Sequence, residues 1–239
     1  MSVSTEGWRT TPVYDPPVYA GRRIAEFYCS GAVYARTGDG RVVLVTTGHC
    51  GDKGTKVPAP GGRPGIMGTF SDHSVDPTCN RPDKSRCAAG DTAYIVLEPP
   101  YIPWGHLDQV DMGAGGYRTI TPDMAILSCA DIALGDPVEV NGRDLYRRGV
   151  VAQKGPNDYQ GDGSYFPCIV AADVKAGIGD SGGLVLVRGL PAGVVAREFG
   201  GLLGFTPLAE SLAEMKLAVC TDPDCGLTPP APDAASATP

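Results

Sequence analysis

The chain has 239 residues, 42% of them hydrophobic, which is enough to bury a substantial core in one two-lobed domain of the all-β kind. Its net charge of −7 argues against nucleic acid as a partner, because no basic stripe is present to neutralise phosphates. The most apolar region, residues 183–206, is interrupted by Arg188, Arg197 and Glu198, so no membrane span is expected.

The predicted elements begin after an N-terminal arm, residues 1–20, which contains proline and tyrosine. The 33 glycines and 22 prolines favour short strands joined by turns. Two series of β-branched and aromatic segments, separated by Gly, Asp and Pro, are typical of such strands. The first series is residues 25–35, 41–47, 65–70 and 91–98. The second series, after a connection at 99–116, is residues 124–129, 137–140, 147–153, 168–174, 183–187, 192–196 and 202–207.

One segment near the C-terminus has a helical period. Residues 208–218 place Leu208, Leu212 and Met215 on one side, which predicts a helix. Residues 220–239 form a tail that contains Cys220 and Cys225, and we expect it to be largely disordered because its end is low-complexity and rich in Pro and Ala.

The segment Gly179-Asp180-Ser181-Gly182-Gly183 carries the strongest chemical signal. Its serine lies at the tip of a turn with glycines on both sides, so backbone can approach a substrate closely and N–H groups can converge on one point. A serine is a poor nucleophile alone, and it needs a base and a group that orients that base. Read alone, Ser181 could equally be a turn serine used for its hydroxyl.

Two upstream residues can supply those groups. His49 follows the apolar segment 41–47 and precedes Cys50, and Asp91 begins the apolar segment 91–98. Each also has a structural interpretation, as a hydrogen-bonded core histidine and as a strand-capping aspartate. Their occurrence together with Ser181 favours nucleophilic catalysis.

These three segments, in the order His, Asp, Ser, resemble the trypsin/chymotrypsin-like serine proteases. Subtilisins and α/β-hydrolases carry the same groups in other orders. The resemblance covers roughly residues 22–218 and is weakest at 100–125 and 140–165, and composition suggests a bacterial or phage relative. It implies an all-β fold of two six-stranded antiparallel β-barrels with a short C-terminal helix. The first barrel would span about residues 21–110, the second about 120–207, and the helix 208–218.

The resemblance also implies the role of each site residue. Ser181 would be the nucleophile, His49 the proton acceptor and donor, and Asp91 the group that orients His49. The backbone N–H groups of Gly179 and Ser181 would form the oxyanion hole. No cofactor and no metal are expected.

Residues around this site differ from the family pattern. In trypsin, the aspartate that corresponds to Asp180 pairs with a newly cut N-terminal amine. Arg23-Ile24 superficially resembles such a cleavage site, but the segment between Ile24 and Cys29 is too short to reach Asp180. Asp180 should find another partner, such as an arginine or backbone amides, because a lone buried carboxylate is costly. Lys175 falls at the position of the family's specificity residue, where it would favour an acidic or polar side chain, although a solvated loop lysine fits equally well. Arg197, on the strand expected to form one pocket wall, departs from the usual pattern.

The eight cysteines form an even set, which allows on the order of a hundred disulfide connectivities. The resemblance pairs Cys29 with Cys50, and the other expected pairs are Cys79–Cys87, Cys129–Cys168 and Cys220–Cys225. Zinc is the alternative, but the chain has no C-x-x-C pair among these cysteines. Disulfides predict a secreted or extracytoplasmic protein. The N-terminal segment has no signal-peptide pattern.

The sequence therefore predicts a serine endopeptidase that acts as a monomer on protein or peptide substrates. The alternative is a catalytically silent member of the fold that serves as an interaction module at a cell or virion surface. The 72–83 loop contains Asp72, Asp76 and Asp83, which could bind a calcium ion. Their spacing fits no standard calcium loop, so the sequence does not decide whether calcium binds there.

Overall fold

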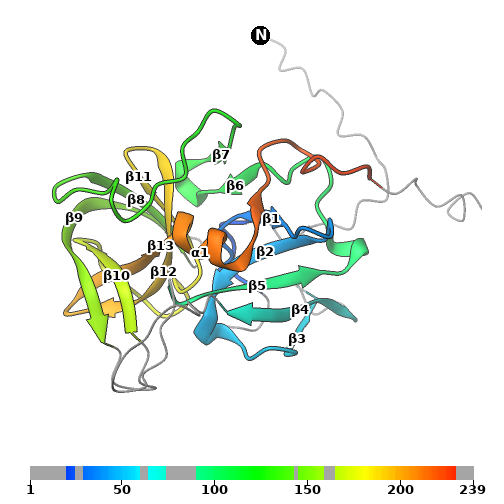
Figure 1. Ribbon diagram of the computed structural model, residues 1–239, viewed down its shortest axis with the longest axis horizontal. Helices are drawn as coiled ribbons and strands as arrows, with labels where there is room; N and C mark the ends of the chain where they lie inside the picture. Colours follow the sequence, from blue (N-terminus) through cyan, green and yellow to red (C-terminus); the bar gives the residue numbers. More distant parts are fainter. Residues whose placement is uncertain are drawn as a thin grey trace, which may run out of the picture.

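The computed structural model describes residues 20–24, 29–59, 64–73, 90–142, 145–158 and 165–229. Its described residues form a six-stranded sheet, a closed six-stranded barrel, a small two-stranded sheet and one short α-helix (Figure 1). The all-β class and the C-terminal helix are therefore confirmed. The strands of the second half of the chain close into the barrel, whereas the six-stranded sheet, formed mainly by the first half, has two edge strands among the described residues.

The six-stranded sheet is antiparallel, in the order β14-β1-β2-β5-β4-β3. Its strands are β1 (Tyr34–Arg36), β2 (Val42–Thr47), β3 (Lys56–Pro58), β4 (Ile66–His73), β5 (Thr92–Leu97) and β14 (Ala218–Val219). Every residue of the central strand β2 is buried, as its uninterrupted run of Val, Leu and Thr predicts for a strand covered on both faces. The short strands β3 and β14 are the two of this sheet that the sequence pattern missed.

The closed barrel has the strand order β10-β13-β12-β11-β8-β9. Its strands are β8 (Pro137–Gly142), β9 (Leu145–Asp158), β10 (Tyr165–Ala172), β11 (Leu184–Val187), β12 (Leu190–Phe199) and β13 (Leu202–Pro207). Arg188 and Gly189 join β11 to β12 with φ angles of 53° and 78°. Positive φ at both central residues is what a tight hairpin turn between twisted strands requires. Closure leaves this unit without an exposed strand edge.

The connection between the two units contains more structure than the sequence predicted. The 3₁₀ turns η3 (Pro99–Tyr101) and η4 (Gly113–Gly115) flank β6 (Gln109–Asp111), which pairs with β7 (Tyr117–Thr119). The strand predicted at 124–129 is wrong. Turns at Thr121–Met124 and Ser128–Asp131 use the backbone groups that a sheet ladder would need.

Helix α1 (Leu208–Met215) ends three residues before the predicted boundary at 218, so that boundary is wrong. Lys216 adopts a left-handed conformation with φ 54° and ψ 45°, and its N–H donates to the Ala213 carbonyl. Such a residue terminates a helix. The chain then turns back so that Val219 of β14 pairs with Ala35 of β1. The C-terminal part of the chain thereby completes one edge of the first sheet.

The two units share a hydrophobic core. Leu184 and Leu186 of β11 are buried in one cluster with Leu44 and Ile95 of the first sheet. Val185, between them, packs inside the barrel with a second cluster. Because alternate residues of a strand face opposite sides, β11 seals the barrel interior on one face and the inter-unit core on the other.

Three disulfides join Cys29 to Cys50, Cys129 to Cys168 and Cys220 to Cys225, which are the pairings expected for these six residues. Cys79 and Cys87 lie outside the described residues, as do the N-terminal arm up to residue 19 and the tail from residue 230. Within the described part of the chain, none of the helices is both long and apolar enough to cross a membrane.

The disulfides Cys129–Cys168 and Cys220–Cys225 should differ in their contribution to stability. Cys129–Cys168 closes a loop with a sequence separation of 39, and Cys220–Cys225 closes one of 5. The chain-entropy model gives about 4 and about 2 kcal/mol, respectively. We expect the Cys129→Ala/Cys168→Ala variant to lose more unfolding free energy than Cys220→Ala/Cys225→Ala in urea titrations. Equal losses would show that the short loop contributes through native contacts of β14 instead.

Candidate active site

His49 and Asp91 lie just beyond the same end of two paired strands. Thr47, the last residue of β2, is opposite Thr92, the first residue of β5. The Asp91 carbonyl accepts hydrogen bonds from the Gly48 N–H at 3.1 Å and from the Thr47 hydroxyl at 2.7 Å. These bonds attach the 3₁₀ turn η1 (Gly48–Cys50), which carries His49, to the start of β5.

The His49 imidazole lies between Asp91 and Ser181. Its Nδ1 is 2.6 Å from Asp91 Oδ2, and its Nε2 is 2.9 Å from Ser181 Oγ. The His49 backbone N–H also donates to Asp91 Oδ1 at 3.1 Å. Both carboxylate oxygens of Asp91 therefore contact the histidine, and the contacts bring together residues 132 positions apart in the chain.

These contacts indicate which nitrogen of the His49 imidazole carries the hydrogen. An ionised carboxylate only accepts hydrogen bonds, so Nδ1 carries the hydrogen that bonds to Asp91. The lone pair of Nε2 then faces Ser181 Oγ and can accept the hydroxyl proton. About half of the His49 side chain is exposed, at 47%, whereas Asp91 is 12% exposed. A substrate can thus reach the histidine, and the carboxylate is shielded behind it.

Asp91 is ionised despite its burial. Burial raises the pKa of this carboxyl, but the hydrogen bond and electrostatic interaction with His49, the positive charge of Arg197 and the hydrogen bond with Thr47 outweigh it. The net result is a pKa of Asp91 below its ordinary value. The group that should orient the histidine is therefore held in its charged form.

The turn around Ser181 depends on a glycine at position 182. Gly182 has a φ of +86°, which favours glycine. A Cβ atom there would lie 2.0 Å from the Ser30 carbonyl oxygen and 2.3 Å from Thr46 Oγ1. The turn therefore approaches the backbone of the first unit more closely than a residue with a side chain at position 182 would permit.

Ser30 connects the serine turn to the first unit. Its backbone N–H donates to the Ser181 carbonyl at 2.6 Å, and its hydroxyl donates to the Gly179 carbonyl at 2.8 Å. Thr46 of β2 donates in turn to the Ser30 carbonyl at 2.8 Å. Ser30 and Thr46 are completely buried. These bonds fix the serine turn against the unit that carries His49 and Asp91.

The backbone of the turn also presents donors. Among the described residues, the N–H groups of Gly179 and Ser181 donate to no backbone carbonyl. The Gly179 carbonyl is held by Ser30, and Gly179 itself has a φ of +98°. These are the two N–H groups that the sequence predicts for an oxyanion hole, and that role stays a prediction.

Asp180 is buried and paired with an arginine. Its side chain is 3% exposed, with Oδ1 2.5 Å from Arg147 Nη2. Its Oδ2 accepts the Gly177 N–H at 2.7 Å. Arg147 also donates to the Lys175 carbonyl at 2.6 Å, so one side chain of β9 ties both sides of the loop before Ser181. The sequence indicated the kind of partner, but not which arginine.

The two residues proposed for a substrate pocket lie in different surroundings. Lys175 is exposed in the segment after β10. Arg197 of β12 is only 17% exposed and points toward the candidate site, with its Nη2 3.8 Å from Asp91 Oδ2. A pocket role for either stays a prediction.

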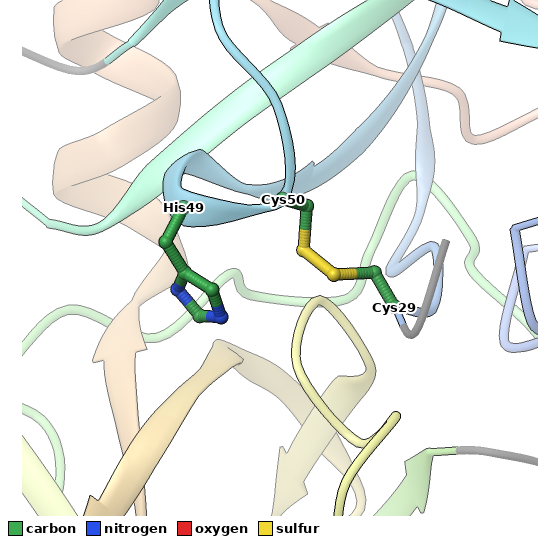
Figure 2. Close-up of side chains that lie close together, drawn as sticks. All are labelled: Cys29, His49 and Cys50. Carbon is green, nitrogen blue, oxygen red and sulfur yellow. A yellow bond between two sulfur atoms is a disulfide. The ribbon is translucent and has the colours of Figure 1, made fainter. Parts of the chain in front are cut away.

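A metal at this site is disfavoured by covalent chemistry. Cys29, His49 and Cys50 bring possible ligand atoms within 4.8 Å of one another. However, the two sulfurs are bonded to each other beside the imidazole (Figure 2), so neither is a thiolate ligand. Asp76 and Asp83 of the possible calcium loop lie outside the described residues, and nothing is described of the Asp72 side chain.

Solved structures of three bacterial proteases are similar to this chain. The Nocardiopsis protease matches with a TM-score of 0.63 and 22% identity over 84% of this chain and 98% of its own. Thermobifida fusca protease A matches at 0.61 and 22%, over 84% and 97%. Cellulomonas bogoriensis chymotrypsin matches at 0.60 and 21%, over 85% and 98%. No protein-family model and no curated protein sequence matches. The chain thus has the trypsin/chymotrypsin-like fold, as the motifs suggested.

The close approach at Gly182 can be tested against a matched glycine. Gly189 has a similar φ of +78°, but a Cβ there would meet nothing within 4 Å. Gly189→Ala should therefore cost only the backbone strain of about 1 kcal/mol, whereas Gly182→Ala should cost at least about 3 kcal/mol. Denaturant unfolding of both variants measures the difference. Equal costs would contradict the contact with Ser30.

The Arg147–Asp180 pair predicts a second, non-additive effect. Arg147→Met leaves a buried carboxylate without its cation and should lower the unfolding free energy by about 3–5 kcal/mol. Adding Asp180→Asn removes the stranded charge, so the double variant should be more stable than Arg147→Met alone. A double variant as unstable as the sum of the single variants would show that the two side chains are not coupled.

Proposed function

We propose that this chain, which has the trypsin/chymotrypsin-like fold, is a serine endopeptidase that hydrolyses peptide bonds through an acyl-enzyme. The observation that carries the proposal is the single imidazole of His49 within hydrogen-bond distance of both Asp91 and Ser181. A serine becomes a nucleophile when a base takes its proton and a third group orients that base. Both contacts are present together, so all three groups are in place.

In the proposed reaction, Ser181 Oγ attacks the carbonyl carbon of the peptide bond while His49 Nε2 takes the hydroxyl proton. Asp91 stabilises the imidazolium that forms. The negative oxygen of the tetrahedral intermediate accepts hydrogen bonds from the Gly179 and Ser181 N–H groups. His49 then gives its proton to the leaving amine, and the acyl group stays on Ser181. A water molecule, deprotonated by His49, hydrolyses this ester and releases the second product.

The resting geometry supports this sequence over a silent interaction module. The turn is pre-formed, because Ser30 fixes it from one side and the Arg147–Asp180 pair fixes it from the other. Charge stabilisation in a preorganised site needs no rearrangement during the reaction. The half-exposed histidine leaves the reacting atoms accessible.

The proposal includes the compartment in which the enzyme acts and its class of substrate. Three disulfides in the described residues fit an extracytoplasmic protein, because reducing compartments keep thiols free. The substrates would be proteins or peptides. We also propose that the first sheet corresponds to the first of the two barrels in this fold.

Hydrolysis of a peptide library, followed by mass spectrometry, tests the proposal. Ser181→Ala should abolish cleavage, and His49→Ala should lower kcat by a factor on the order of 10⁴ or more, because the nucleophile loses its base. The control is Ser128→Ala, since Ser128 is a partly exposed serine whose hydroxyl bonds only to the nearby Asp131 carboxylate in the described structure.

The Ser128→Ala control should cleave like the unmodified protein. Full activity in Ser181→Ala would refute the proposal. A folded, unmodified protein that cleaves nothing in the library would favour the silent module.

A further inference from the structure

Arg197 is directed inward by an irregularity in its strand. The register between β12 and β13 shifts between Val195, opposite Phe205, and Arg197, opposite Gly204. Such a β-bulge changes the direction of the side chains that follow it. The result is a largely buried arginine on the strand that the sequence assigned to a pocket wall.

The guanidinium of Arg197 lies between an aromatic ring and a carboxylate. Its Cζ is 4.9 Å from the centroid of the Phe166 ring on β10, and its Nη2 is 3.8 Å from Asp91 Oδ2. Phe166 is 4% exposed, so it offers a firm surface. A cation over a ring face is attracted by it, and a desolvated one more strongly. Stacking thus fixes the guanidinium at a defined distance from Asp91.

Arg197 approaches the same oxygen that binds the histidine. Asp91 Oδ2 is 2.6 Å from His49 Nδ1 and 3.8 Å from Arg197 Nη2. The longer distance excludes a direct hydrogen bond but allows a strong Coulomb interaction, because both side chains are largely buried. The groups that face the Asp91 side chain are thus His49 on η1, Thr47 on β2 and Arg197 on β12.

We propose that Arg197 is a positioning residue, and not a wall of the substrate pocket. It acts through Asp91 to position His49, the base that activates Ser181. This inference rests on the proposed function. The guanidinium keeps Asp91 ionised and its Oδ2 directed at His49 Nδ1. To bind an acidic side chain of a substrate, Arg197 would have to leave its contacts with both Phe166 and Asp91, which argues against a pocket role.

The electrostatic effect has a definite sign. Burial raises the pKa of Asp91, and the hydrogen bond and electrostatic interaction with His49 together with the positive charge of Arg197 bring it below its ordinary value. Without Arg197, the pKa of Asp91 rises. Asp91 is then protonated at a higher pH, where His49 Nδ1–H faces a neutral carboxyl, a weaker acceptor than the carboxylate. The acid limb of the rate profile should therefore move to higher pH.

The test compares Arg197→Gln with Arg197→Lys, which keeps the charge, and with Arg41→Gln as the matched control. Arg41 is an exposed arginine paired with Asp39. The probe is 4-nitrophenyl acetate, whose acyl group has no side chain to occupy a pocket. Arg197→Gln should lower kcat for this ester by about tenfold, far less than the roughly 10⁴-fold loss when a triad aspartate is replaced.

The pH profile and the conservative variant separate positioning from folding. Arg197→Gln should shift the acid limb of kcat to higher pH, Arg197→Lys should restore most of the rate, and Arg41→Gln should match the unmodified protein. Unchanged ester turnover, with only KM for peptides raised, would overturn the inference and make Arg197 a pocket residue. A loss in Arg197→Gln without a shifted profile, and not restored by lysine, would also overturn it.

A measurement without turnover distinguishes this inference from the proposed function. In the Ser181→Ala background, the ¹³C carboxyl resonance of Asp91 can be titrated with and without Arg197→Gln. The midpoint should move to higher pH on removal of Arg197, whether or not the chain is a protease. An unchanged midpoint would refute the inference even if the enzyme is active.

Discussion

The hydrogen bonds between Ser30 and the serine turn are the constraint on which the rest of the site depends. Ser30 binds the carbonyls on both sides of Asp180, those of Gly179 and Ser181, from a position about 150 residues earlier in the chain. Gly182 makes this approach possible, because any side chain there would overlap the Ser30 carbonyl. The shared core holds the two units together, and this contact adds a direct link between the serine turn and the unit that carries the base.

Buried charge reinforces the same geometry. Asp180 and Asp91 are both shielded carboxylates, and each is approached by an arginine from the barrel: Arg147 from β9 and Arg197 from β12. A buried carboxylate is tolerated only with such partners. The closed barrel supplies them at fixed positions because its strands have no free edge. The scaffold therefore stabilises the turn before Ser181 and the carboxylate behind His49.

Sequence reasoning recovered what depends on local pattern. Strand alternation and glycine-flanked turns identified most strands, and motif order identified the three candidate residues. It missed the end of helix α1, because Lys216 adopts a left-handed conformation that is usual for glycine or asparagine. It could not single out Ser30 or Arg147, whose contacts are set by the packing of distant strands. Arg197 was predicted for a pocket wall, and its contacts with Phe166 and Asp91 could not be predicted, because a β-bulge that redirects a side chain has no clear sequence signal.

The central claim is that Ser181 is a nucleophile activated by His49. Reaction with a fluorophosphonate, followed by intact-mass and peptide mass spectrometry, tests it without knowledge of the substrate. The account predicts one adduct per chain on Ser181, formed at a rate that falls by orders of magnitude in His49→Ala. No adduct on the folded protein, or an adduct whose rate is the same without His49, would contradict it.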